Sequence, residues 1–248
     1  MSNSKILADK LRQFCAERKF EKAVVGLSGG VDSAVVLAVA ATALGAKNVS
    51  ALILPQNSVS SAESKMLAEK VAAQFGVQTF EFEIGGIIDK FPPPWSTSLP
   101  TGRQVRLAKM NLAPRIRMTA LFHFANSQNA LVLGTSNRSE ILLGYGTKFG
   151  DFAADVEVLG NFFKTEVFAL ARELGVPPAI ISRAPTAELF ENQNDESELG
   201  ANYSVLDKIL IRLEKNNFAL PENPTELEKN ILERVRTNRH KIELTPNL

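Results

Sequence analysis

Apolar residues follow two patterns along the chain, short runs and longer stretches in which they recur at helical spacing. The short runs and one alternating segment predict strands at 23–27, 49–54, 78–83 and 130–134. Helical spacing predicts a helix that begins at Ser4 and further helices near 32–44, 60–75, 105–127, 164–174, 203–215 and 224–236. Because parallel strands are joined by long crossovers, this alternation predicts an α/β fold, with a doubly wound parallel sheet flanked by helices.

Local signals refine this outline. Ser60 and Glu63 have the spacing of a capping box at a helix start. Pro114 has no N–H group to donate, so the helix at 105–127 is expected to start or kink there. The C-terminal third contains further helices and loops but no clear strand, so we expect extra C-terminal helices on one sheet and a single domain over 1–248.

Composition and charge exclude several classes of function. The chain has 28 Lys and Arg against 27 Asp and Glu, a net charge of +1, which predicts no broad basic surface for nucleic acid. The longest uncharged apolar run, 34–46, is shorter than the roughly 18–20 residues that cross a membrane. Cys15 is the one cysteine and the N-terminus has no secretory pattern, so we expect no membrane partner and a reducing, cytoplasmic location.

The segment Ser28-Gly-Gly-Val-Asp-Ser33 lies at the junction of the first buried strand and a helix. Adjacent glycines and unpaired N–H groups at a helix start favour an anion, so the segment predicts a phosphate-binding loop. It lacks the lysine of the P-loop and the spacing of the dinucleotide fingerprint. Asp32 suits such a site if it holds Mg²⁺. The alternative is an ordinary turn in which Asp32 complements the helix dipole.

A second polar segment, Gly134-Thr-Ser-Asn-Arg-Ser-Glu140, follows the fourth predicted strand and so lies at the same edge of the sheet. Glu140 is placed to be a second metal ligand, and Thr135 to meet the adenine or ribose; taken alone, Glu140 is an ordinary first-turn helix acid. The segment 143–155 contains glycines, a lysine and aspartates that no core element would tolerate, and a loop of this length is usually functional.

Together these motifs resemble one family. The loop Ser28–Ser33 is similar to that of the N-type ATP pyrophosphatases, which include the GMP, asparagine, argininosuccinate and NAD synthetases. The motifs that extend the resemblance to the NAD synthetases, in the order of that family, are Arg115-Ile-Arg-Met118, Leu131 to Pro178, Ala184-Pro-Thr-Ala-Glu-Leu189, Asp195 to Tyr203 and His240-Lys241. They cover the chain from about residue 5 to 241 and imply an adenine-nucleotide alpha-hydrolase-like (Rossmann-like) fold.

The resemblance also implies a reaction and a set of site residues. ATP adenylates the nicotinate carboxylate of deamido-NAD, pyrophosphate leaves, and ammonia attacks the mixed anhydride to give NAD and AMP. The implied ATP-binding residues are Gly26, Leu27, Ser28, Gly29, Gly30, Val31, Asp32, Ser33, Thr135, Lys164 and Thr186, with Asp32 and Glu140 as Mg²⁺ ligands and Asp32, Glu140 and Lys164 as the catalytic set. The implied deamido-NAD residues are Arg115, Lys148, Asp155, His240 and Lys241.

Several expectations accompany this interpretation. The partners would be ATP, deamido-NAD and ammonia, with the helix at 105–127 in a homodimer interface because its apolar residues spread over more than one stripe. The segments 91–103 and 187–200 resemble loops that close over substrates in the family. The alternatives are a GMP synthetase-like amidotransferase, which the motifs at 147–151 and 185–189 disfavour, and a non-catalytic ATP-binding module, which would have little need for a second metal ligand. Individually, Lys148, Lys164 and His240 could be ordinary surface residues.

Overall fold

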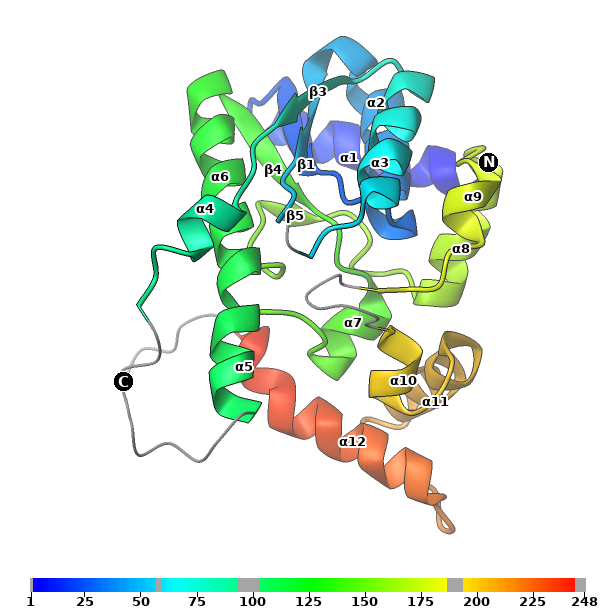
Figure 1. The fold of residues 1–248 in the computed structure, drawn as a ribbon. Coiled ribbons are helices and arrows are strands. Elements are labelled where there is room, and N and C mark those ends of the chain that lie inside the picture. The colour runs from blue at the N-terminus through cyan, green and yellow to red at the C-terminus, as the bar shows by residue number, and fades with distance from the viewer. Residues whose placement is uncertain (1, 57–58, 93–102, 187–193, 244–248) are drawn as a thin grey trace.

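A five-stranded parallel sheet forms the centre of the molecule (Figure 1). The computed structural model describes residues 2–56, 59–92, 103–186 and 194–243. The strands are β1 (Lys22–Gly26), β2 (Val49–Ile53), β3 (Gln78–Glu81), β4 (Ala130–Gly134) and β5 (Val156–Glu157), in the spatial order β3-β2-β1-β4-β5. The order reverses between β2 and β4, on either side of β1, so the predicted doubly wound sheet is confirmed and a ligand site is expected at the carboxyl end of β1.

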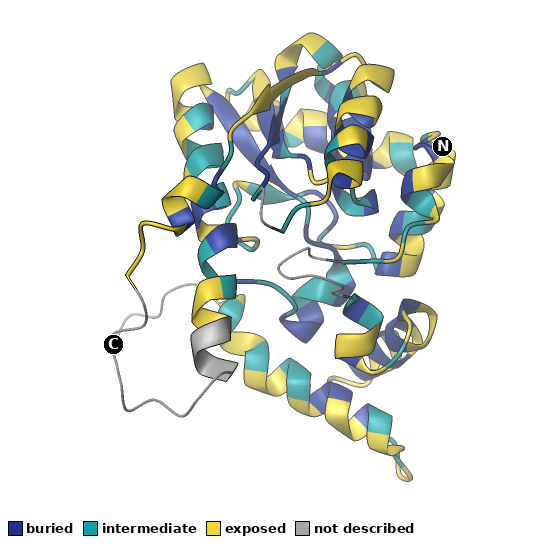
Figure 2. Cartoon of the chain, viewed as in Figure 1, coloured by how far each residue is buried: buried dark blue, intermediate teal, exposed yellow. Residues whose placement is uncertain are grey.

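Helices cover both faces of this sheet (Figure 1). One face carries α1 (Asn3–Glu17), α2 (Val31–Leu44), α3 (Ala62–Gln74), α8 (Lys164–Glu173) and the short α9 (Pro178–Ile181), and the other carries α4 (Gly85–Ile88) and α6 (Leu112–Gln128). Consecutive strand residues point to opposite faces, so Val25 belongs to the first core and Val24 to the second. Both are fully buried, as expected of a central strand covered on two sides (Figure 2).

A third apolar cluster lies beyond the carboxyl edge of the sheet. It is built from α7 (Arg138–Leu143), α10 (Asp195–Leu199), α11 (Tyr203–Lys215) and α12 (Glu226–Asn238). Short 3-10 helices, η1 (Ala46–Asn48) and η2 (Arg239–Lys241), precede β2 and follow α12. The predicted C-terminal helices are therefore confirmed, and they stand over the end of the sheet where ligands bind (Figure 1). Among the described residues, no helix has the length and apolar character to cross a membrane.

Two predicted helix starts are wrong by one or two residues. Ser2, not Ser4, precedes α1, and the Ser4 hydroxyl instead donates to Glu173 at 2.5 Å. Ser61, not Ser60, caps α3 by accepting the Ser64 N–H, so the predicted capping box with Glu63 is not formed. In both cases the serine hydroxyl has another partner, since Ser60 Oγ accepts the N–H of Gln56.

The predicted long helix is divided in two. α5 (Arg103–Met110) ends before Asn111, and α6 begins at Leu112 with Pro114 in its first turn, where a missing N–H costs nothing. The expected start near Pro114 is therefore confirmed. The strand expected at 78–83 ends at Glu81, and the two-residue β5 was not predicted because it is too short to show a pattern. Of the two segments expected to be loops, 93–102 and 187–193 lie outside the described residues, and α10 occupies 195–199.

Candidate active site

A pocket of about 430 Å³ opens at the carboxyl ends of β1, β2 and β4. Its walls come from the loop after β1, from the turn after β4, from α6, and from α10, α12 and η2 of the C-terminal cluster. The pocket is therefore closed by segments that are distant in sequence, and its size suits a small-molecule ligand.

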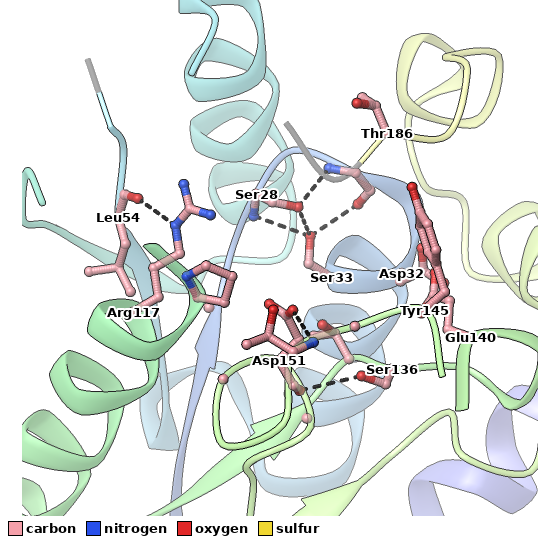
Figure 3. A pocket seen from close by; sticks show the side chains of 18 of the residues that line it. Ser28, Asp32, Ser33, Leu54, Arg117, Ser136, Glu140, Tyr145, Asp151 and Thr186 are labelled. Atoms are coloured by element: carbon pink, nitrogen blue, oxygen red, sulfur yellow. Dashed lines mark hydrogen bonds between the residues drawn. The ribbon is translucent and has the colours of Figure 1, made fainter. Parts of the chain in front are cut away.

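The loop Ser28–Ser33 forms one wall and is held by its own hydroxyls (Figure 3). Ser33 Oγ accepts the N–H of Ser28 at 3.3 Å and donates to Gly30 O at 3.1 Å, and Ser28 Oγ accepts the N–H of Gly30 at 3.2 Å. Gly29 has φ +82°, and a Cβ there would lie 2.3 Å from the carbonyl oxygen of Ser64. The backbone is thus fixed in a conformation that only glycine accommodates, and no side chain caps the start of α2. These are the features of an anion-binding loop.

Asp32, Glu140 and Lys164 come together beside this loop. Lys164 Nζ lies 2.5 Å from Asp32 Oδ2 and 3.3 Å from Glu140 Oε1. Lys164 is only 2% exposed. Two carboxylates and one ammonium share this small volume, so with both carboxylates ionised the group carries one net negative charge and favours a further cation.

Asn137 fixes the two carboxylates. Its side-chain Nδ2 donates to Asp32 Oδ1 at 2.8 Å, and its Oδ1 accepts the N–H of Glu140 at 3.0 Å. Glu140 Oε2 in turn accepts the N–H of Asn137, which completes a capping box at the start of α7. Asn137 was not among the predicted site residues, although the Asn-x-x-Glu spacing at 137–140 is a capping signal.

Burial sets the electrostatics of this group. Burial raises the pKa of Glu140 to about 7, against the opposing effect of the Lys164 ammonium, and the charge of Asp32 adds to the rise. Burial alone would lower the pKa of Lys164, but the neighbouring Asp32 and Glu140 carboxylates raise it above its ordinary value. Lys164 therefore stays charged at every physiological pH, and Glu140 is the carboxyl of the group that can take up a proton near neutral pH.

The donor set suits Mg²⁺ bound together with a phosphate ligand. No cluster of three or more His, Cys, Asp or Glu side chains with metal-binding geometry occurs in the part of the chain that the structure describes. Mg²⁺ is commonly held by one or two carboxylates, with the remaining positions filled by water and substrate phosphates. Asp32 and Glu140, next to an anion-binding loop, fit that requirement.

The structure brings most of the predicted ATP residues to the pocket. Thr135, Lys164 and Thr186 line it, as do Gly26, Leu27, Ser28, Gly30, Val31, Asp32 and Ser33. Gly29 is not among the lining residues, and its contribution is to the shape of the loop.

Four of the five predicted deamido-NAD residues lie close together, and of these four only Lys241 lines the pocket. Arg115 Nε donates to Lys148 O at 3.3 Å, and Lys148 Nζ donates to His240 O at 2.7 Å. Lys241 Nζ donates to Gly144 O at 2.8 Å and lines the pocket. The fifth, Asp155, is not a lining residue: its Oδ2 accepts the N–H of Val132 in β4, at 2.7 Å.

The pocket also contains polar residues that the sequence interpretation left without a role. Arg117 donates from Nε to Leu54 O at 3.0 Å and lies across the loop from Asp32 and Glu140 (Figure 3). The Tyr145 hydroxyl lies 3.0 Å from Asp195 Oδ1 and 2.8 Å from Glu198 Oε2. The signals for these residues were their motifs, since Arg117 is the second arginine of Arg-x-Arg-Met and Asp195 begins Asp-Glu-Ser-Glu-Leu-Gly.

Known proteins give an independent comparison. The family model described as NAD synthase matches residues 4–245. The NH(3)-dependent NAD(+) synthetase of Methanococcus aeolicus is 44% identical over 218 residues, which is 86% of this chain and 85% of that protein. That of Wolinella succinogenes is 42% identical and covers 97% of this chain and 92% of that protein. Among solved structures, NMN synthetase from Francisella tularensis superimposes with a TM-score of 0.84 at 30% identity, over 99% of this chain and 97% of that one.

The match includes the segments that form the walls of the pocket, from the loop after β1 to the C-terminal cluster. It includes the elements that carry Asp32, Glu140 and Lys164, and it reaches His240 and Lys241. The chain therefore belongs to the NAD synthase family.

Proposed function

We propose that this protein catalyses the ATP-dependent amidation of deamido-NAD to NAD by ammonia, with release of AMP and pyrophosphate. The observation that carries the proposal is the buried group of Lys164, Asp32 and Glu140 beside the anion-binding loop. The names of the most similar relatives support the same activity.

The reaction has two steps. An oxygen of the nicotinate carboxylate attacks the α-phosphorus of ATP, and pyrophosphate leaves with the electrons of the broken P–O bond. Ammonia then attacks the carbonyl carbon of the mixed anhydride and loses a proton to solvent, and AMP leaves with the electrons of the broken C–O bond. The substrate carboxylate is itself the nucleophile, so the protein contributes position and charge rather than a covalent intermediate.

Each part of the pocket has a role in this scheme. The N–H groups at the start of α2 bind phosphate oxygens, and Lys164 offsets the negative charge of the departing pyrophosphate. Asp32 and Glu140 would hold Mg²⁺, which supplies positive charge against the repulsion between the carboxylate and the triphosphate. Arg115, Lys148 and Lys241 provide cations for the phosphates of deamido-NAD. The hydrogen bond that Asp155 accepts from Val132 in β4 holds the segment just before β5 in place.

The test is an assay with ATP, Mg²⁺, ammonium chloride and deamido-NAD, followed by quantification of NAD, AMP and pyrophosphate. We expect the three products in equal amounts, and ADP with phosphate as the products would overturn the proposal. Asp32→Asn and Glu140→Gln should each lower the rate by about 100-fold or more, because each removes one preorganised electrostatic contact. Deamidated NMN serves as a second acceptor, because a similar solved structure is that of an NMN synthetase. Faster turnover of deamidated NMN than of deamido-NAD would identify the smaller molecule as the substrate.

Ammonia as the nitrogen source is tested separately. The two curated relatives described above are named NH(3)-dependent, and Cys15 is buried on α1 in the first apolar core and is not among the pocket-lining residues. We expect turnover with ammonium chloride and none with glutamine as the sole nitrogen source. Efficient use of glutamine by the purified protein would contradict this part of the proposal.

We also propose a homodimer with α6 in its interface. The edge strand β3 is exposed along its length (Figure 2), and exposed apolar side chains occur from this strand to the residues after α4. The most exposed are Phe80 at 38%, Phe82 at 49% and Phe91 at 53%, and Phe80 packs on Phe124 of α6 with ring centroids 4.9 Å apart. A contiguous apolar patch of this kind on a soluble enzyme favours a protein interface.

Sedimentation velocity tests the dimer. Phe82→Glu should convert it to monomers, whereas Met66→Glu, a matched change at an exposed apolar residue on α3, should not. A wild-type protein that sediments as a fully active monomer would end this part of the proposal. As a single-domain enzyme that uses ATP and has a free thiol, the protein would act in the cytoplasm.

A further inference from the structure

Asp207 on α11 lies outside the pocket and none of the roles above involves it, yet it is almost completely buried, with 2% of its surface exposed. A buried carboxylate is costly unless its oxygens are well satisfied. In this chain both are: Oδ1 accepts the hydroxyl of Ser139 at 2.6 Å, and Oδ2 accepts the N–H of Thr165 at 2.8 Å.

The two partners of Asp207 are neighbours of the catalytic pair. Ser139 precedes Glu140 on α7, and Thr165 follows Lys164 on α8. A third bond closes the arrangement, because Ser139 Oγ also accepts the N–H of Lys164 at 2.9 Å. Ser139 and Lys164 are themselves 0% and 2% exposed, so water does not compete for these bonds.

These bonds do two things at once. They satisfy the first N–H groups of α8, a helix that begins at Lys164, and the charge of Asp207 is favourable next to the positive end of that helix. They also tie α7 to α8 through one rigid side chain. The distance between Glu140 on α7 and the ammonium of Lys164 on α8 then depends on a residue that touches neither ATP nor metal.

We propose that Asp207 is a positioning residue of the ATP-cleaving site: its two carboxylate oxygens hold Ser139 and Thr165, and so keep Glu140 and Lys164 in their mutual geometry. The inference rests on the proposed function, because it assumes that Lys164 and Glu140 act on ATP. Asp207→Asn is the decisive variant. Both partners donate to Asp207, but an amide has a single acceptor oxygen, so the Ser139 hydroxyl and the Thr165 N–H can no longer both donate to this side chain in the same geometry, and the negative charge next to the start of α8 is lost.

The expected effect is on kcat. A misplacement of about 1 Å in a preorganised site costs about 100-fold, so we expect Asp207→Asn to lower kcat by about 10- to 100-fold. The KM for deamido-NAD should change less than about threefold, because the cationic residues proposed for that substrate lie on other segments.

The matched control is Glu228→Gln. Glu228 is also a buried carboxylate, at 4% exposure, and it also accepts an N–H group at a helix start, that of Thr225. It belongs to α12 and has no bond to α7 or α8 among those the structure gives. Both variants should lose thermal stability, but only Asp207→Asn should lose kcat when both are assayed well below their melting temperatures.

A double-mutant cycle separates positioning from general stability. In a Lys164→Ala background, Asp207→Asn should have little further effect on the rate of AMP formation, because the geometry between Glu140 and the Lys164 ammonium that it maintains no longer exists. An equal fold-loss in both backgrounds would overturn the inference, as would a normal kcat in Asp207→Asn.

If Asp207→Asn does not fold, Ser139→Ala tests the same connection. It removes only the bridging hydroxyl and should lower kcat by about 3- to 10-fold, a part of the loss expected for misplacement, and an unchanged kcat would overturn the inference. A failure of the wild-type protein to form AMP and pyrophosphate would instead refute the proposed function, so the two failures are distinguishable.

Discussion

Glu157 should make the stability of the protein fall as the pH rises. Its carboxylate lies over Gly134 at the end of β4, where Oε2 accepts the N–H of Ser136 at 3.0 Å and the buried Oε1 has no hydrogen-bond partner in the described structure. Burial raises the pKa of Glu157 to about 8, against the hydrogen bond from Ser136, and the charges of Glu140 and Asp151 add to the rise. Glu157→Gln keeps the shape and removes the charge.

The sign and size of the effect follow from linkage. Between pH 4.5 and about 8 the folded protein keeps a proton on Glu157 that the unfolded chain releases, so this carboxyl lowers the stability as the pH rises through that window. The difference between the two pKa values corresponds to an upper limit of about 5 kcal/mol. With the screening typical of folded proteins we expect about 2 kcal/mol, or roughly 4–8 °C in melting temperature for a chain of this size.

Thermal unfolding of wild type and Glu157→Gln from pH 5 to pH 9 measures this contribution. Other buried carboxyls titrate in both proteins, so the difference between the two curves isolates Glu157. The variant should nearly match wild type at pH 5 and exceed it progressively from there to about pH 8, with the full gain at about pH 8.5 and above. Parallel curves across the whole range would refute the reasoning.

Three other predictions concern the same edge of the sheet. Gly134→Ala should destabilise the protein by about 1–3 kcal/mol in denaturant unfolding, because the new Cβ would lie 2.2 Å from the Glu157 carboxylate; Glu157→Ala in the same chain should restore most of the loss, and no rescue would contradict the contact. Gly29→Ala should raise the KM for ATP by about tenfold or more, since φ +82° and the Ser64 carbonyl both exclude a side chain; an unchanged KM would show that the loop does not bind phosphate. Lys164→Met should bind Mn²⁺ without ATP at least about tenfold more tightly than wild type in calorimetry, because an ammonium no longer lies between two carboxylates; equal affinities would show that lysine and metal do not compete.

Most of the fold could be predicted from the sequence because its signals are local. The strand from 23 to 27 is a short apolar run that ends at Ser28-Gly29-Gly30, and the helix after it has strongly apolar composition, so burial on both sides is visible in the pattern. β5 could not be found in this way. Its two residues pair with Leu133 and Gly134, and nothing local distinguishes them from the surrounding loop.

The candidate site likewise contains some contacts that the sequence predicts and others that it does not. Asp32 and Glu140 follow neighbouring strands, so their proximity follows from the topology of a parallel sheet. The contact of Lys164 with both depends on how α8 docks, and Asn137 and Asp207 contribute through side-chain bonds that span up to 105 residues of sequence. Such long-range hydrogen bonds produce no periodic pattern in the amino-acid sequence. Asp155 is the opposite case. Its motif matches that of the family, but its carboxylate accepts the backbone N–H of Val132 in β4.

The central place of β1 in the sheet has a consequence for biosynthesis. β1 pairs with β2 on one side soon after both are made, but its other edge pairs with β4, where Lys22 lies opposite Ala130. At about 5–20 residues per second, synthesis of the roughly 100 intervening residues takes about 5–20 s. During that time β1, whose residues 23–25 are apolar and buried in the folded sheet, has one open edge, which is a template for wrong pairing. Nascent chains of this protein therefore pass through an interval in which this edge of β1 is exposed to mispairing, and the interval ends once β4 has been synthesised and can pair with it.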